Sequence, residues 1–238
     1  MRKIVITGAS SEIGTAIAKA ICTRDDEVIL HGSSRLLACE QLKSELGEKC
    51  CVVQANFTLH EEIDSFCGLL KETDILVNAA AVTITENLPS LSDANIEEMI
   101  RVNIFAFIKT CRATIPSMLR KRKGNIINIS SVAALRGNRG QTVYAGTKGF
   151  VESFSRSLAA EYGSKGIRVN TVAPGPIEAG TLKETLQYAE KEIRSSIVSK
   201  RLGTAHDVAE AVKFLIRDSA SFINGTTLRV DGGFLHGI

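Results

Sequence analysis

The chain has 238 residues, of which 44% are hydrophobic and 23% are charged, a composition typical of a soluble globular domain. Its formal net charge of +3 is too small to indicate nucleic-acid or anionic-membrane binding, and no run of eighteen apolar residues could span a bilayer. The apolar segment at the N-terminus is too short for a signal peptide, so we expect one cytoplasmic domain over residues 1–238.

Apolar runs with strand character alternate with helical patterns along the chain. The predicted strands cover residues 3–6, 27–30, 50–54, 75–77, 125–129, 168–172 and 227–230. The predicted helices cover about 13–23, 35–46, 60–70, 92–121, 143–162, 181–198 and 206–217. This alternation predicts an α/β fold, a Rossmann-like doubly wound parallel sheet of about seven strands with helices on both faces. Ligands of such sheets bind beyond the carboxyl ends of the strands.

The first predicted strand leads into T-G-A-S-S-E-I-G, residues 7–14, and then into a helix. Gly8 permits a tight turn, Gly14 permits close packing of the helix on the strand, and the N-terminus of a helix favours a phosphate. The pattern indicates a site for the pyrophosphate of a dinucleotide. The alternative is a plain turn between a strand and a helix.

The second predicted strand carries the signal for cofactor choice. An acidic residue at its end would bind a ribose 2′-hydroxyl and repel a 2′-phosphate. Gly32 stands there instead, followed by Ser33, Ser34 and Arg35, whose hydroxyls and guanidinium suit a phosphate. We therefore predict that NADP(H) is favoured over NAD(H). The alternative is that Arg35 only begins a solvated helix.

The six cysteines lie at positions 22, 39, 50, 51, 67 and 111, without a C-x-x-C pair or a histidine at metal-ligand spacing. Most fall in apolar patterns, where a free thiol behaves as a small hydrophobic group. We therefore expect reduced thiols and no metal site. We interpret Cys50 and Cys51 as the buried start of a strand; the alternative is that they form a redox pair.

A candidate catalytic group lies around the start of the predicted helix 143–162. Tyr144 and Lys148 are four residues apart and so share one helix face. The pKa of a free phenol is about 10, and a neighbouring ammonium lowers it toward the range useful for acid–base catalysis. Ser131, at the end of the preceding strand, could hydrogen-bond the same substrate oxygen. Alone, the Tyr-Lys pair would be ordinary helix surface.

These motifs resemble, in order and spacing, those of the short-chain dehydrogenase/reductase family over nearly the whole chain. The matching positions are Gly8, Gly14, Asn78-Ala79-Ala80-Ala81, Asn103, Ser131, Tyr144, Lys148, Pro174-Gly175 and Val230-Asp231-Gly232-Gly233. The resemblance implies further cofactor contacts at Ser10, Ser11, Ile13, Asn56, Phe57, Asn78, Ala79, Ala80, Tyr144, Lys148, Pro174, Gly175 and Ile177.

The resemblance also implies a mechanism. NADPH would deliver hydride to a carbonyl carbon while Tyr144 protonates the oxygen and Ser131 holds it. Lys148 would lower the pKa of the tyrosine and bind the nicotinamide ribose, and Asn103 would keep a water-linked proton path to Lys148.

The chain departs from the family pattern at several cofactor positions. Glu12 replaces the middle glycine, so its carboxylate must point away from the phosphates. Ser11 stands where NADP-specific members often have a basic residue, and Asn56 where an aspartate often meets the adenine amine. Ala81 replaces a glycine, and Ala179 a threonine. None of these changes removes a catalytic group.

Within that family, the length and ending are most similar to the β-ketoacyl-acyl-carrier-protein reductases. In those enzymes two basic positions near the active-site entrance dock the acidic carrier protein, and Arg122 and Lys165 match them. The alternative for residues 120–123 is a solvated helix C-terminus, where cations are favoured. The resemblance further implies a substrate lid at about 181–200 and a homotetramer paired through the helices 92–121 and 143–162.

Other functions remain open at this point. The chain could act on a free small ketone, sugar or polyol, or it could be a catalytically idle cofactor-binding scaffold. An intact set of Asn103, Ser131, Tyr144 and Lys148 counts against the scaffold. An enoyl reductase is disfavoured because such relatives space the tyrosine and lysine more widely. Nucleic-acid binding is disfavoured because no aromatic residues interleave the basic run.

Overall fold

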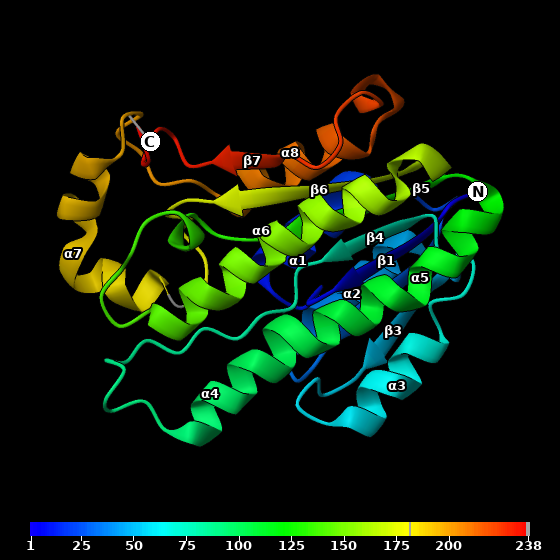
Figure 1. Cartoon of the computed structure of the whole chain (residues 1–238). Helices are drawn as coiled ribbons and strands as arrows, with labels where there is room; N and C mark the ends of the chain where they lie inside the picture. Colours follow the sequence, from blue (N-terminus) through cyan, green and yellow to red (C-terminus); the bar gives the residue numbers. More distant parts are fainter. Residues whose placement is uncertain (181, 237–238) are drawn as a thin grey trace.

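Seven parallel strands form one sheet in the order β3-β2-β1-β4-β5-β6-β7 in the computed structural model, which describes residues 1–180 and 182–236 (Figure 1). The strands are β1 Lys3–Thr7, β2 Glu27–Gly32, β3 Cys50–Gln54, β4 Ile75–Asn78, β5 Gly124–Ile129, β6 Ile167–Pro174 and β7 Thr227–Val230. Every predicted strand is confirmed, with ends shifted by at most two residues. The strand order reverses between β1 and β4, so the expected ligand site lies beyond the carboxyl ends of these two strands.

The helices connect successive strands. They are α1 Glu12–Ile21, α2 Leu37–Leu46, α3 His60–Gly68, α4 Asp93–Ile100, α5 Phe107–Lys121, α6 Thr142–Tyr162, α7 Leu182–Ser196 and α8 Ala205–Ile216. The single helix predicted over 92–121 is wrong in one respect, because a π-helical turn, η1 Arg101–Ala106, separates α4 from α5. Short 3-10 turns, η2 Val132–Ala134, η3 Gly163–Lys165 and η4 Asp218–Ala220, were not predicted.

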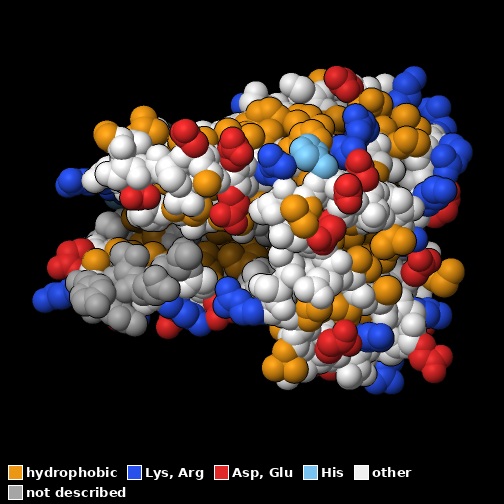
Figure 2. Space-filling model, turned by 90° about the horizontal axis from the view of Figure 1, so that it is seen from below, with side chains coloured by type: hydrophobic (Ala, Val, Ile, Leu, Met, Phe, Trp, Pro, Cys, Tyr) orange, Lys and Arg blue, Asp and Glu red, His pale blue; other side chains and the backbone are white. Residues whose placement is uncertain are grey.

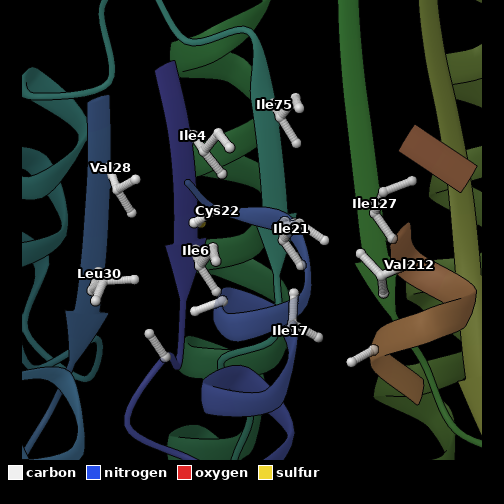
Figure 3. Close-up of a cluster of buried hydrophobic side chains, with 14 of the residues drawn as sticks. Ile4, Ile6, Ile17, Ile21, Cys22, Val28, Leu30, Ile75, Ile127 and Val212 are labelled. Carbon is white, nitrogen blue, oxygen red and sulfur yellow. The ribbon is translucent and has the colours of Figure 1, made fainter. Parts of the chain in front are cut away.

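One face of the sheet is covered by α1, α2 and α8. Alternate residues of each strand point to this face, because successive side chains of a strand lie on opposite sides. Figure 3 shows part of this core, with buried side chains from the sheet, α1 and α8: Ile4, Ile6, Ile17, Ile21, Val28, Leu30, Ile75, Ile127 and Val212. Because both faces of the sheet are buried, its strands carry apolar residues on both sides.

The other face is covered by α3, α5 and α6. Val5, Leu76 and Ile126, the strand residues that alternate with those of the first face, pack there against helix residues such as Phe66 and Phe107. The carboxyl ends of the strands form one edge of the sheet. This edge lies on the left in Figure 1, where α7 and the N-terminus of α6 also lie. Within the described residues, no helix is long and apolar enough to cross a membrane.

Candidate active site

The turn after β1 is built so that only glycine fits at two positions. Gly8 has φ +68°, and a Cβ there would lie 2.7 Å from the Ala80 Cα. A Cβ at Gly14 would lie 2.2 Å from the carbonyl oxygen of Gly8. Ser11 caps α1, because its Oγ accepts a hydrogen bond from the Gly14 N–H at 3.0 Å. The first turn of a helix leaves N–H groups without intrahelical partners, and this cradle therefore fits the pyrophosphate of a dinucleotide.

A buried histidine that sequence reasoning missed supports this turn. The Nδ1 of His31 accepts a hydrogen bond from the Gly8 N–H at 3.1 Å, and its Nε2 lies 2.9 Å from the Ala55 carbonyl oxygen. Burial lowers the pKa of His31 to about 4, so the ring is neutral, with its proton on Nε2. Its position at the penultimate residue of β2, beside the expected phosphate turn, was the only signal in the sequence.

Two predicted cofactor positions after β3 have their side chains engaged within the chain. Phe57 is buried and stacks on His31 with ring centroids 3.9 Å apart, so a cofactor could reach only its backbone. The Oδ1 of Asn56, at the position where an aspartate often meets the adenine amine, already accepts from the N–H and hydroxyl of Thr58, at 3.0 and 2.9 Å. Asparagine side chains in turns often form local hydrogen bonds of this kind.

The end of β2 lies beside the phosphate turn. A Cβ on Gly32 would lie 2.9 Å from the Oγ of Ser10, so the two turns touch at this point. Ser33, Ser34 and Arg35 follow as exposed residues. Their hydroxyls and guanidinium are therefore accessible to an anionic group next to the glycine turn.

The side chain of Asn78 does not face the site, so a cofactor could contact this residue only through its backbone. It is buried in a polar network, where its Nδ2 donates to Asn128 Oδ1 at 3.0 Å and its Oδ1 accepts from the Thr110 hydroxyl at 2.9 Å. Asn128 in turn donates to the Ser155 Oγ at 2.8 Å. The reason is that Asn78 is the last residue of β4, directly opposite Asn128 of β5, and both point to the face covered by α5 and α6.

Several other predicted cofactor residues lie at the same edge of the sheet. The N–H groups of Ala79 and Ala80 each donate to the Thr7 Oγ1 at 3.2 Å. Pro174 ends β6, and Gly175 follows it. The side chain of Ile177 is buried in the core, so this residue could contact a cofactor only through its backbone. Ile13, in the first turn of α1, is partly buried against the same core.

The structure brings Ser131, Tyr144 and Lys148 together beyond the carboxyl end of β5. Tyr144 is in the first turn of α6, and the Nζ of Lys148 lies 5.7 Å from the centre of its ring. Lys148 is buried, and its Nζ donates to the Ile129 carbonyl oxygen at 2.9 Å. Burial lowers the pKa of Lys148 to about 8, because an ammonium loses its hydration there.

The pKa of Tyr144 is raised, not lowered as the sequence predicted. Burial of the phenol is the largest cause and outweighs its hydrogen bonds with Thr83 and Ser131, which lower the pKa. The phenol therefore keeps its proton at neutral pH, which suits a proton donor. Thr83 was missed by sequence reasoning, although it follows β4 at the edge where polar residues were expected to gather.

Asn103 joins this group from the π-helical turn η1. Its Oδ1 accepts from the Val82 N–H at 2.8 Å, and its Nδ2 donates to the Val82 carbonyl at 2.8 Å and to the Thr147 Oγ1 at 3.1 Å. The side chain is thus engaged in holding the loop after β4 against α6, and the proton path stays a prediction. Single π-helical turns inside α-helices are frequent at functional sites.

The predicted docking residues lie at the opposite edge of the sheet. Arg122, with φ 49°, precedes β5, and Lys165 precedes β6. Gly166 brings them together, because a Cβ there would lie 2.1 Å from the Arg122 carbonyl oxygen. Tyr144 is at the other end of α6, whose 21 residues span roughly 30 Å at 1.5 Å per residue. Within one chain, the pair therefore lies far from Tyr144, and its docking role stays a prediction.

The predicted lid corresponds to α7 and the residues after it. Ala189 has non-helical dihedral angles, φ −131° and ψ 19°, which divide the helix. Residue 181 of the predicted segment lies outside the described residues.

Figure 2 shows a hollow with hydrophobic side chains in its floor, on the side of the molecule where the strands end in Figure 1. In the described part of the chain, no group of three or more His, Cys, Asp or Glu side chains could hold a metal ion.

Comparison with known proteins gives consistent matches over almost the whole chain. Residues 8–235 match the family model described as enoyl-(acyl carrier protein) reductase. The chain is 39% identical over 233 residues to the 3-oxoacyl-[acyl-carrier-protein] reductase of Haemophilus influenzae, covering 96% of each chain. It is 37% identical over 236 residues to nodulation protein G of Rhizobium sp. (strain N33), covering 98% of this chain and 96% of the relative.

Solved structures agree with these relatives. A protein from Beutenbergia cavernae, described as an NAD(P)-dependent gluconate 5-dehydrogenase and solved with NADP, superposes with a TM-score of 0.91. It is 30% identical, and the match covers 98% of this chain and 96% of that chain. Together with the glycine turn and the Ser131, Tyr144 and Lys148 group, these matches show that the chain is an NAD(P)-dependent oxidoreductase of the short-chain dehydrogenase/reductase family.

Proposed function

We propose that the protein is an NADPH-dependent reductase of a 3-oxoacyl thioester carried by acyl-carrier protein, giving the 3-hydroxyacyl product. The observation that carries the chemistry is the protonated phenol of Tyr144, hydrogen-bonded by Ser131 and Thr83 at the edge that holds the glycine turn. The substrate class is supported by the 39% identity to the Haemophilus influenzae reductase along 96% of both chains.

Each residue of the site would have a separate role in carbonyl reduction. The reduced nicotinamide supplies a hydride when it is bound. Tyr144 holds the proton that the substrate oxygen takes up, and Ser131 orients that oxygen by a hydrogen bond. Lys148, fixed by the Ile129 carbonyl, places a cation beside the phenol and favours the tyrosinate that remains after proton transfer. Asn103 and Thr147 hold α6 so that these groups keep their spacing.

Substrate assays test the proposal directly. NADPH oxidation is measured with acetoacetyl-acyl-carrier protein, a small acetoacetyl thioester, simple ketones, sugars and an enoyl thioester. Fast turnover of the carrier-bound ketone that falls as salt rises supports the proposal, because charge complementarity with an acidic carrier is screened by salt. NADPH oxidation by sugars alone, or reduction of NADP+ by a polyol, would favour the second candidate, a dehydrogenase of free small substrates, which the match to the gluconate dehydrogenase supports. Reduction of the enoyl thioester would contradict both.

Arg35 gives the test of cofactor choice. We expect Arg35→Ala to raise the Kd for NADPH by roughly ten- to a hundredfold, because a charge-assisted hydrogen bond to a phosphate contributes about 1.5–3 kcal/mol. The Kd for NADH should change by less than about twofold, since NADH has no 2′-phosphate. Titration of nicotinamide fluorescence measures both constants, with Arg24→Ala, another exposed arginine, as the control. Equal losses for the two cofactors would show that Arg35 does not meet the 2′-phosphate.

We further propose that the enzyme is a cytoplasmic homotetramer, and that Arg122 and Lys165 dock the carrier protein for the active site of another copy. The support is geometric, because the pair lies roughly 30 Å from Tyr144 of its own chain, along the length of α6. Antiparallel packing of α5 and α6 between two copies would bring the pair of one subunit to the catalytic edge of the other.

Charge reversal tests this docking pair. We expect Arg122→Glu to raise the KM for acetoacetyl-acyl-carrier protein about tenfold and to leave the KM for a small thioester unchanged, because repulsion weakens encounter with an acidic partner. Steady-state kinetics at low salt measure both values, and Lys43→Glu, an exposed lysine on α2, controls for total charge. A similar rise for both substrates would remove the docking proposal.

A further inference from the structure

Glu12 joins the phosphate-binding turn to the start of the lid. It is the first residue of α1, at the position where the family pattern has glycine. Its Oε2 accepts a hydrogen bond from the Gly180 N–H at 2.9 Å, and its Oε1 forms an ion pair with the Nζ of Lys183. These partners are 168 and 171 residues away in sequence, so both contacts depend on the folded position of the segment that leads into α7.

The location of this carboxylate poses an electrostatic problem for cofactor binding. The N-terminus of α1 is the end to which the pyrophosphate of a dinucleotide binds, and a carboxylate in the first helical turn lies within a Debye length of it. The pair with Lys183, the Gly180 hydrogen bond and the nearby Arg35 keep the pKa of Glu12 below its usual value. The carboxylate is therefore ionised at neutral pH, and its charge opposes that of a bound pyrophosphate unless a cation offsets it.

We propose that Lys183 and the Gly180 N–H form part of the dinucleotide site by neutralising Glu12 and holding it away from the pyrophosphate. The first turn of the lid must then be docked on the phosphate-binding turn for the cofactor to bind tightly. Lys183 acts through Glu12, so it is a positioning residue. By linkage, a bound dinucleotide stabilises the docked lid as much as the docked lid strengthens dinucleotide binding. The inference rests on the NAD(P) cofactor of the family and is independent of the substrate.

A double-mutant cycle tests this role. The Kd for NADPH is measured by fluorescence titration, without any substrate, in the native protein, Lys183→Met, Glu12→Gln and the double variant. We expect Lys183→Met to raise the Kd roughly three- to tenfold, because it leaves the carboxylate beside two phosphates without its ion-pair partner. In the Glu12→Gln background the same change should alter the Kd by less than about twofold, since no charge remains to be offset.

Controls separate this role from its alternatives. Lys191→Met, an exposed lysine of the same helix, should leave the Kd within about twofold of the native value. The deficit of Lys183→Met should shrink as salt is added, because the repulsion is screened. An equal loss in both Glu12 backgrounds would mean that Lys183 touches the cofactor itself, and no loss in either would mean that the pair is only surface. Both results overturn the proposal, whereas failure with a ketoacyl substrate leaves it intact.

Discussion

Replacing Tyr144 with phenylalanine is expected to lower kcat by about 10²–10⁴-fold, the range that a positioned general acid contributes. The phenol is protonated at neutral pH and shares hydrogen bonds with Ser131 and Thr83, so its hydroxyl is placed to donate a proton to a substrate oxygen. Phenylalanine keeps the ring but removes that proton. Because the ring stays in place beside Lys148, the Kd for NADPH should remain within about threefold of the native value.

The measurement is NADPH oxidation under substrate saturation, together with a fluorescence titration of NADPH in the same preparation. Tyr162→Phe, the last residue of the same helix, serves as the matched control and should retain full activity. Retained turnover in Tyr144→Phe would mean that another group, such as Ser131 or a solvent molecule, protonates the oxygen. Loss of NADPH binding along with turnover would instead point to a structural role for the hydroxyl.

Gly14→Ala should destabilise the protein by about 3 kcal/mol, at the upper end of the usual cost of overpacking a close contact. The added Cβ would lie 2.2 Å from the Gly8 carbonyl oxygen and 2.8 Å from the Ala9 Cα, so backbone atoms must move. For a chain of this size the melting temperature should fall by roughly 6–12 °C. The displaced turn should also bind NADPH poorly, because the same atoms form the phosphate cradle.

Gly68→Ala is the matched control for this effect. Gly68 ends α3 on the surface, and a Cβ there would meet no atom within 4 Å. Since alanine loses less conformational entropy than glycine in a helix, the control should be stabilised by about 0.5–1 kcal/mol. Thermal unfolding followed by circular dichroism compares the two variants. An unchanged melting temperature in Gly14→Ala would show that helix α1 can move away from the turn at little cost.

Much of the fold follows from local patterns in the sequence. Each apolar run became a strand because a parallel sheet buried on both faces accepts continuous hydrophobic residues, and a polar alternation would have left polar groups in one core. The edge formed by the carboxyl ends of the strands could also be predicted as the ligand site, because the motifs all follow strands. The step from Tyr144 to Lys148 fixed a shared helix face without further information.

What could not be predicted depends on contacts between distant segments. The raised pKa of Tyr144 results from burial by the assembled site, which no local spacing reveals. The π-helical turn around Asn103 is held by Val82 and Thr147, 21 and 44 residues away. The positions of Arg122 and Lys165 could be found only from the folded sheet, because a motif match does not show at which edge of the sheet two loops meet.

The amide network around Asn78 and Asn128 also bears on how the strands choose their alignment. Most of the side chains that β4 and β5 bury are apolar, and an apolar strand could pair with its neighbour after a slip of one or two residues at little loss of burial. A slipped β5 would carry Asn128 away from Asn78 and leave buried amide groups unpaired, at about 1–3 kcal/mol for each. The network thus works against misregistered pairing in the middle of the sheet, and it secures the distance between the glycine turn after β1 and Ser131 after β5.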